Sequence, residues 1–241
     1  MRIFLAGASG AIGRRLVPLL LAAGHHVIGT TRSGEKANEL KAGGVQAVVV
    51  DVFDPKTLRD SVVWARPEVV VHQLTDLPQV LDPARLCDAL TRNARLRIEG
   101  TPNLVAAAEA AGVGRLIAQS IAFAYAYGPE PHAEGDALAS ADGNEPSAVT
   151  ARGVRALEEA VLNAPSIEGI VLRYGRLYGP GTWNTRNARA PLHVDAAAHA
   201  AMLALTRGAA GIYNIAEDDG AVSIEKACRE LGFDPGFRLP V

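Results

Sequence analysis

Short apolar runs along this chain alternate with longer segments in which apolar residues recur at helical spacing. The apolar run over residues 3–6 stops at Gly7, as the buried strand of a parallel sheet does. Residues 11–23 follow with apolar positions on one helical face, and Gly24 is a typical residue for ending a helix. An apolar run over residues 27–29 predicts a second strand, so the chain opens with a strand, a helix and a strand.

The same alternation predicts the rest of the chain. Further strands are expected at residues 47–50, 68–72, 116–119, 170–172 and 212–215. Further helices are expected at residues 36–42, 55–65, 83–111, 150–163, 194–206 and 223–231. Strands that alternate with helices indicate a parallel sheet with helices on both faces. Two long segments, 121–147 and 174–192, depart from the alternation, and both follow strand ends at the edge where open parallel sheets bind ligands.

A glycine-rich turn joins the first expected strand to the first expected helix, and it reads Gly-Ala-Ser-Gly-Ala-Ile-Gly over residues 7–13. Three glycines at this spacing allow a tight turn, close approach of the backbone to a diphosphate, and close packing of helix on strand. The helix N-terminus supplies unpaired N–H groups to the phosphates. A plain tight turn is the alternative, but the strand–turn–helix context favours dinucleotide binding. The expected contacts are Gly7, Ser9, Gly10, Ala11, Ile12 and Gly13.

The end of the second expected strand distinguishes NAD from NADP. NAD-specific units carry an acidic residue there for the ribose hydroxyls, whereas this chain has Arg32 and no acid before Glu35. A guanidinium can form paired hydrogen bonds to a 2′-phosphate, although a solvated surface arginine is the alternative. NADP is therefore favoured, with NAD possible, and Asp51 and Val52 are expected to flank the adenine.

These features predict an α/β protein of the Rossmann type, with a doubly wound parallel sheet and a small, reduced C-terminal substrate lobe. With 241 residues, the chain fits one α/β domain with an appendage. We expect an NAD(P)-binding core over residues 1–172. Residues 173–241 are expected to form the reduced lobe, together with a late strand and helices that pack on the core.

Motifs further along the chain resemble those of the extended short-chain dehydrogenase/reductases, the NAD-dependent epimerase/dehydratase family. Residues 70–75 (VVHQLT) look like its fourth-strand motif, and residues 93–104 (NARLRIEGTPNL) are similar to its N-x-x-G-T-x-N-L helix. Residues 172–181 (LRYGRLYGPG) and 193–195 (HVD) are similar to two later motifs. The resemblance implies an atypical member of this family, with further cofactor contacts at Gln73, Leu74, Thr75, Asn93, Gln119, Tyr174 and Leu177.

The catalytic pair of that family is absent. The family uses Tyr-x-x-x-Lys, whose spacing places both side chains on one helical face, so that the ammonium lowers the phenol pKa for proton exchange. The resemblance puts Val149 and Gly153 at these two positions and Ile121 at the position of the family's Ser or Thr. No lysine lies between residues 57 and 225, and none of the five tyrosines precedes a lysine or arginine by four residues.

Hydroxyl groups remain as candidate proton donors near the expected nicotinamide position, chiefly Ser120 and Tyr125, with Tyr127 on the same long loop. Ser120 ends the fifth expected strand, and Tyr125 follows on the long loop; a turn-capping hydroxyl and aromatic packing are the respective alternatives. Arg152 is one residue short of the lysine position and so points about 100° away around the helix. The family also inserts several tens of residues where this chain has residues 182–192, so either the lobe is reduced or a mobile stretch is missing from the sequence.

Composition excludes several other classes. The net charge is −2 and no basic face is evident, which argues against nucleic acid as a partner. No apolar run reaches the roughly 18–20 residues of a membrane span. Cys87 and Cys228 belong to no C-x-x-C pair, so reduced thiols in a cytoplasmic protein are expected. No metal-binding motif is present, and no metal is expected.

Two functions remain open from the sequence. The first is an NADP-dependent oxidoreductase or epimerase-like enzyme that acts on a small carbonyl, hydroxyl or sugar-type substrate without the usual dyad. The second is a redox-silent NAD(P) sensor or regulatory binding protein. The absence of the dyad is the reason for this alternative. The resemblance also implies a homodimer in which the helices over 83–111 and 150–163 pair across a two-fold axis.

Overall fold

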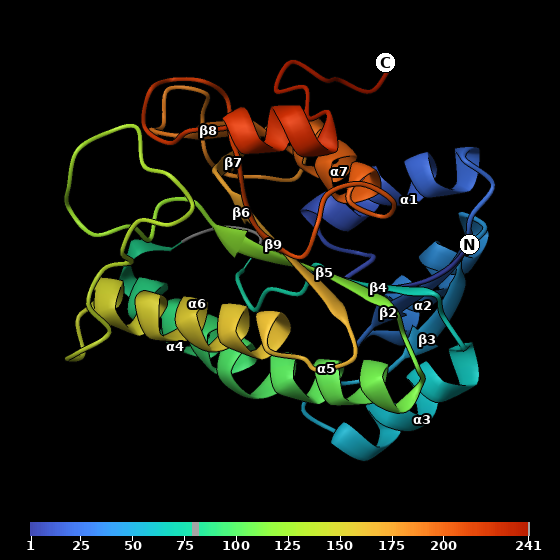
Figure 1. The fold of residues 1–241 in the computed structure, drawn as a ribbon. Coiled ribbons are helices and arrows are strands. Elements are labelled where there is room, and N and C mark those ends of the chain that lie inside the picture. Colours follow the sequence, from blue (N-terminus) through green and yellow to red (C-terminus); the bar gives the residue numbers. More distant parts are fainter. Residues whose placement is uncertain (79–81, 241) are drawn as a thin grey trace.

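The computed structural model describes residues 1–78 and 82–240, which form an α/β fold around one seven-stranded sheet (Figure 1). The strand order is β3-β2-β1-β4-β5-β6-β9, and every pairing is parallel. The strands are β1 (Arg2–Ala6), β2 (His26–Thr31), β3 (Gln46–Val49), β4 (Val69–His72), β5 (Arg115–Ile121), β6 (Glu168–Tyr174) and β9 (Gly211–Ile215). The predicted doubly wound Rossmann sheet is confirmed.

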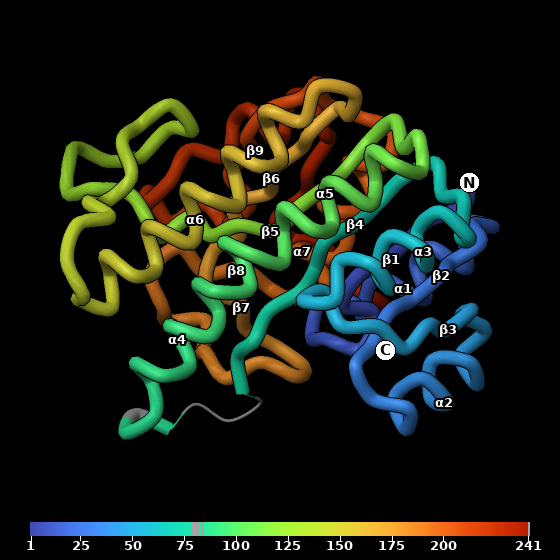
Figure 2. The backbone as a smooth tube through the Cα atoms, turned by 90° about the horizontal axis from the view of Figure 1, so that it is seen from below, coloured from blue at the N-terminus to red at the C-terminus, as the bar shows by residue number. Residues whose placement is uncertain are grey.

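Helices cover both faces of this sheet (Figure 1). On one face α1 (Ala11–Ala22) packs against α7 (Val194–Leu203). The other face carries α3 (Pro55–Ala65), α4 (Leu86–Arg95), α5 (Thr101–Ala110) and α6 (Pro146–Leu162), which Figure 2 shows from the outside. The remaining helix, α2 (Gly34–Ala42), packs against the edge strands β2 and β3. Each face buries its own apolar cluster, because a strand covered on both sides must place hydrophobic side chains on both.

The prediction of one continuous helix over residues 83–111 is wrong. The structure has a 3₁₀ turn η1 (Pro83–Arg85), then α4, a π-helical turn η2 (Leu96–Gly100), and α5. Pro102 has no N–H to donate to the carbonyl of residue 98, so the regular hydrogen-bond ladder is interrupted there. A Cβ on Gly100 would come within 2.8 Å of Val52, which shows how closely this turn approaches the β3 end.

The last two expected helices also differ. The helix expected over residues 194–206 is regular only through Leu203. Residues 223–231 yield only a short helical segment that contains the π turn η3 (Ala227–Leu231).

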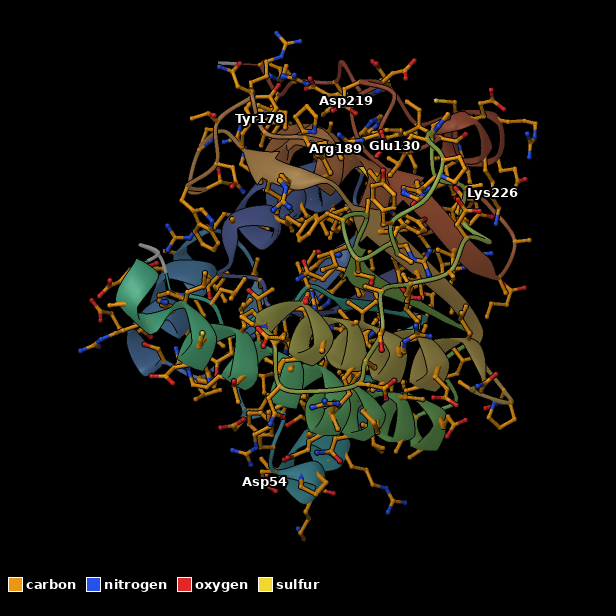
Figure 3. All side chains as sticks on the ribbon, turned by 90° about the vertical axis from the view of Figure 1, so that its left-hand side faces the viewer. Asp54, Glu130, Tyr178, Arg189, Asp219 and Lys226 are labelled. Atoms are coloured by element: carbon orange, nitrogen blue, oxygen red, sulfur yellow. The ribbon has the colours of Figure 1, made fainter. Side chains whose placement is uncertain are left out.

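The long segment between β5 and α6 is anchored to the rest of the protein at several places. Tyr125 bridges to Leu138 within the segment, and His132 bridges to Val222 before the last helix. Arg152 of α6 donates hydrogen bonds to two backbone carbonyls of the segment, at residues 141 and 143. Glu130 and Arg189 form an ion pair that joins this segment to the chain preceding β8 (Pro191–His193), as Figure 3 shows. The segment is therefore built into the sheet edge where ligands bind.

A second, two-stranded parallel ribbon pairs β7 (Arg176–Tyr178) with β8. It follows directly on β6, with Gly175 between the two strands at a point where a Cβ would lie 2.3 Å from the Ala190 carbonyl. No helix in the described part of the chain is long and apolar enough to cross a membrane.

Candidate dinucleotide-binding site

The glycine-rich turn between β1 and α1 has no space for side chains. Gly7 has a φ of +92°, and a Cβ there would lie 2.5 Å from the Gln73 carbonyl oxygen. A Cβ on Gly13 would lie 2.3 Å from the Gly7 carbonyl oxygen. Gly10 begins α1 with no side-chain cap, so the first N–H groups of the helix keep no internal partner. This cradle fits a diphosphate, which needs backbone N–H donors and close approach.

Three polar side chains gather at the carboxyl ends of β4, β5 and β6. Gln73 is buried, and its Nε2 donates to the Tyr174 hydroxyl at 3.3 Å. Gln119 donates from Nε2 to the Leu74 carbonyl at 3.4 Å. Burial raises the pKa of Tyr174, so its phenol stays protonated. The Oε1 atom of Gln73 is buried without a hydrogen-bond partner among the described residues, which fits a ligand that brings a donor to this position.

Arg32 and Asn93, two of the expected cofactor contacts, both bind Asp76, a residue that was not among the predicted contacts. An Arg32 Nη2 atom lies 3.3 Å from Asp76 Oδ1, and Asn93 Oδ1 accepts a hydrogen bond from the Asp76 backbone N–H at 2.9 Å. Thr75 is exposed beside them. The signal that points to Asp76 is an acid directly after the fourth-strand motif. Arg32 is exposed, so it can exchange this carboxylate for another anion.

The turn after β3 is fixed to the next layer. Asp51 accepts a hydrogen bond from the Phe53 N–H at 3.0 Å and remains exposed. The Val52 carbonyl accepts one from Asn103 of α5 at 2.9 Å. Leu177, the other expected contact, lies half-buried in β7.

The two chief candidate proton donors are held in structural hydrogen bonds. Ser120 donates to Glu158 Oε1 at 2.8 Å, and the same carboxylate forms a two-point ion pair with Arg173, at 2.8 and 2.7 Å. Glu158 and Arg173 are both buried. Tyr125 donates to Asn214 Oδ1 at 2.7 Å and accepts from Arg173 at 2.9 Å, and burial raises its pKa. Nothing in the sequence pattern had indicated the Glu158–Arg173 pair.

The position of the family lysine is occupied by packing. A Cβ on Gly153 of α6 would lie 2.9 Å from the Ala94 Cα and 3.4 Å from Arg97 Cδ. Helix α4 and the turn η2 therefore fill the space in which a lysine side chain would begin. In residues 1–78 and 82–240, no group of three or more His, Cys, Asp or Glu side chains is arranged to hold a metal ion.

Comparison with known proteins agrees with this geometry. The sequence model of the family described as NAD(P)H-binding matches residues 7–189. A Streptomyces protein named 3-diazoavenalumate denitrifying reductase is 40% identical over 264 aligned positions, which cover 100% of this chain and 84% of that protein. The photosystem II assembly factor Ycf39 of Synechocystis is 31% identical over 133 positions, or 54% of this chain and 37% of that protein.

Solved structures share the fold at low identity. The UDP-glucose 4-epimerase of Thermotoga maritima superposes with a TM-score of 0.77 at 19% identity, covering 99% of this chain and 94% of that one. The dTDP-glucose 4,6-dehydratase DesIV of Streptomyces venezuelae gives 0.70 at 23% identity, covering 89% and 75%. With the glycine cradle, the sheet order and the family match in agreement, the chain belongs to the NAD(P)H-binding family.

Proposed function

We propose that this protein is an NAD(P)H-dependent reductase that removes the nitrogen pair of a diazo compound as N₂ and replaces it with hydrogen. The observation that carries the proposal is an intact dinucleotide cradle beside a site in which α4 fills the place of the family lysine. The 40% identity to a diazo-compound reductase over the whole chain supports the same reaction class.

The stoichiometry explains why the dyad is dispensable. Carbonyl reduction needs a hydride and also a proton, because negative charge develops on oxygen as the hydride arrives. A diazo compound that takes up a hydride loses its C–N bond, forms a C–H bond, releases N₂, and leaves one negative charge on the remaining molecule. Water neutralises that charge after the nitrogen has left. No side chain has to deliver a proton while the bonds change.

The residues of this chain would bind and orient the cofactor, and the reduced nicotinamide supplies the hydride when it is bound. The cradle at Gly7, Gly10 and Gly13 holds the diphosphate, and Gln73 and Tyr174 border the nicotinamide end. Arg32 takes the 2′-phosphate, which makes NADP the preferred dinucleotide.

A cationic and aromatic surface lies where the substrate would bind. The Arg176 guanidinium lies over the Phe123 ring, 4.2 Å from its centroid, and these residues follow the ends of β6 and β5. Phe123 is 41% exposed, and burial lowers the pKa of Arg176. No carboxylate of the described residues acts on the charge of Arg176, whose pKa is lowered by burial alone, so the guanidinium can bind a carboxylate from a ligand. We therefore propose a conjugated or aromatic carboxylate as the substrate class.

The test supplies 3-diazoavenalumate as probe, with a panel of carbonyl compounds and UDP-glucose as comparison substrates. Oxidation of NADPH is followed by absorbance, and N₂ release is followed by mass spectrometry. One N₂ per NADPH consumed, with far slower carbonyl reduction, is the expected result. Fast carbonyl reduction without N₂ release would replace the proposal by the ordinary reductase chemistry of the family.

A second candidate function is a dinucleotide-responsive binding protein, which the match to an assembly factor favours. It predicts tight NADPH binding with no turnover of any compound in the same panel.

A further inference from the structure

Arg97 is a largely buried cation that forms no ion pair with the described residues. It lies in the π-helical turn η2 and is only 5% exposed. Within residues 1–78 and 82–240, Glu158 is the carboxylate that acts on its charge, and it does so without a hydrogen bond. Burial lowers the pKa of Arg97 to about 10, so it still carries its charge at neutral pH. Burying an unpaired charge is costly, and proteins keep such groups where a ligand completes them.

The two side chains that act on Arg97, Glu158 and His72, already have other hydrogen-bond partners. The carboxylate of Glu158 acts on its charge, but Arg173 already holds both oxygens of that carboxylate. His72 is the other neighbour, and burial together with the charge of Arg97 lowers its pKa to about 4. Its Nδ1 accepts from the Leu74 N–H, which leaves Nε2 to donate to the Thr101 hydroxyl. The neutral imidazole therefore has no free lone pair for a guanidinium.

Arg97 also lies beside the position of the missing lysine. Its Cδ is 3.4 Å from where a Cβ on Gly153 would be, so its side chain runs through the space where a side chain at 153 would start. It approaches this space from the opposite helix, η2 instead of α6.

The order of the sheet indicates which part of a dinucleotide reaches this place. The cradle lies at the end of β1, and Arg32 follows β2 on the adenine side. The other half of the dinucleotide must extend across β4 and β5. His72 ends β4 and Ser120 lies near the end of β5, and both border the cluster that contains Arg97 and Glu158.

We propose that Arg97 supplies the cation that other family members take from the lysine of Tyr-x-x-x-Lys, and that its guanidinium binds the nicotinamide–ribose half of the dinucleotide. An arginine holds hydroxyl and other oxygen acceptors but does not give up its proton at physiological pH. That property suits a reaction in which no side chain transfers a proton. The inference rests on the dinucleotide binding of the proposed function and not on its diazo substrate.

The test measures binding without turnover, by calorimetry, for two ligands. NADP⁺ carries the nicotinamide half, and adenosine 2′,5′-bisphosphate lacks it. Arg97→Met is expected to weaken NADP⁺ binding by about 10- to 100-fold, the usual range for losing charge-assisted hydrogen bonds. Binding of the bisphosphate stays within about two-fold, because no contact to the adenine half changes. Arg97→Lys recovers part of the NADP⁺ affinity.

Arg95→Met is the matched control, since Arg95 lies two residues earlier, is exposed, and pairs with Glu99 on the outer surface. It should leave both affinities unchanged. A separate readout follows His72 by NMR: its pKa rises in Arg97→Met, because one of the two causes that lower it is removed.

Unchanged NADP⁺ affinity in Arg97→Met would overturn the inference, as would an equal loss for both ligands, which indicates a general distortion. The melting temperature of the free protein gives a further check. A large drop in this temperature for Arg97→Met would assign Arg97 a purely structural role. Selective loss of NADP⁺ affinity in a protein that turns over no diazo compound would retain this inference while rejecting the proposed reaction.

Discussion

At the residue scale, we expect the choice between NADP and NAD to depend on one exposed guanidinium, that of Arg32. Arg32 is paired with Asp76 at 3.3 Å, a contact between partly solvated groups that contributes little to stability. Arg32→Ala is expected to weaken NADPH binding by about 10- to 100-fold, because charge-assisted hydrogen bonds to a phosphate are lost. NADH, which has no 2′-phosphate, should be nearly unaffected.

Fluorescence titration of both dinucleotides against the wild type and the variant checks this. Asp76→Asn is the companion variant: it frees Arg32 from its ion pair and should leave NADPH binding equal or tighter. Equal losses for NADPH and NADH in Arg32→Ala would show that Arg32 does not contact the phosphate.

Arg176 provides the corresponding prediction for the substrate. Arg176→Gln keeps a polar side chain of similar length but removes the charge, so the KM for a diazo carboxylate should rise by about 10- to 100-fold. The affinity for NADPH should stay the same, because Arg176 belongs to the proposed substrate surface and not to the glycine cradle. Steady-state kinetics with titration of NADPH separates the two effects. A fall in NADPH affinity instead would move Arg176 into the cofactor site.

At the element scale, the close packing of α4 on α6 leaves no space for a side chain at residue 153, where the resemblance puts the family lysine. Gly153 lets the helices approach until a Cβ would touch the backbone of residue 94. Simply restoring the lysine therefore cannot restore the family chemistry, because the helices would have to separate first. The packing of two helices closes the space at residue 153, so a single substitution there does not reopen it.

Gly153→Ala tests that packing. The added methyl meets backbone at 2.9 Å, and such overpacking costs about 1–3 kcal/mol, partly offset by the better helix propensity of alanine. We expect a net loss of about 1–2 kcal/mol in the free energy of unfolding, measured by urea denaturation. Gly34→Ala in α2 is the control, since a Cβ there meets nothing within 4 Å. A neutral Gly153→Ala would show that α4 and α6 can separate at no cost.

At the scale of the whole molecule, His72 makes global stability depend on pH. Its pKa is about 4 in the folded protein against an ordinary value of 6.5, so the unfolded chain binds a proton that the folded one excludes. Stability therefore falls as the pH drops from about 6.5 to 4, by about 3 kcal/mol from this group. His72→Asn should flatten that part of the profile. Parallel profiles for the two proteins would remove His72 as the cause.

The outer surface of α5 and α6 is a candidate interface between two copies of the chain. A groove of about 450 Å³ lies between them, and it is lined by Ile98, Pro102, Val105, Ala156 and Ala160 among others. We propose that a second copy of the chain packs here across a two-fold axis, as the family resemblance implies. Light scattering at micromolar concentration should give twice the chain mass, and Ile98→Asp, at a 39% exposed position, should give the monomer. A monomeric wild type would reject the dimer.

The sequence by itself determined the sheet, the cradle and the absence of the dyad. Apolar runs that end at glycines predict strands locally, and the glycine spacing over residues 7–13 predicts the turn, although Gly7 is also required by the carbonyl of Gln73. Gly7, Gly10 and Gly13 could be predicted as cofactor contacts from this spacing, and the motif order added Gln73 and Tyr174 to the prediction.

Only the tertiary structure decided which side chains meet. Ser120 and Arg173 lie 53 residues apart in the chain, yet both donate hydrogen bonds to Glu158, because α6 packs against β5 and β6. Arg97 and Gly153 lie on different helices, and no periodicity within either one records their contact. A local sequence pattern indicates which backbone conformation a residue favours. Which side chains meet in the interior depends on contacts between segments that are far apart in the chain. For that reason the fold was readable from the chain, and the unpaired cation in its site was not.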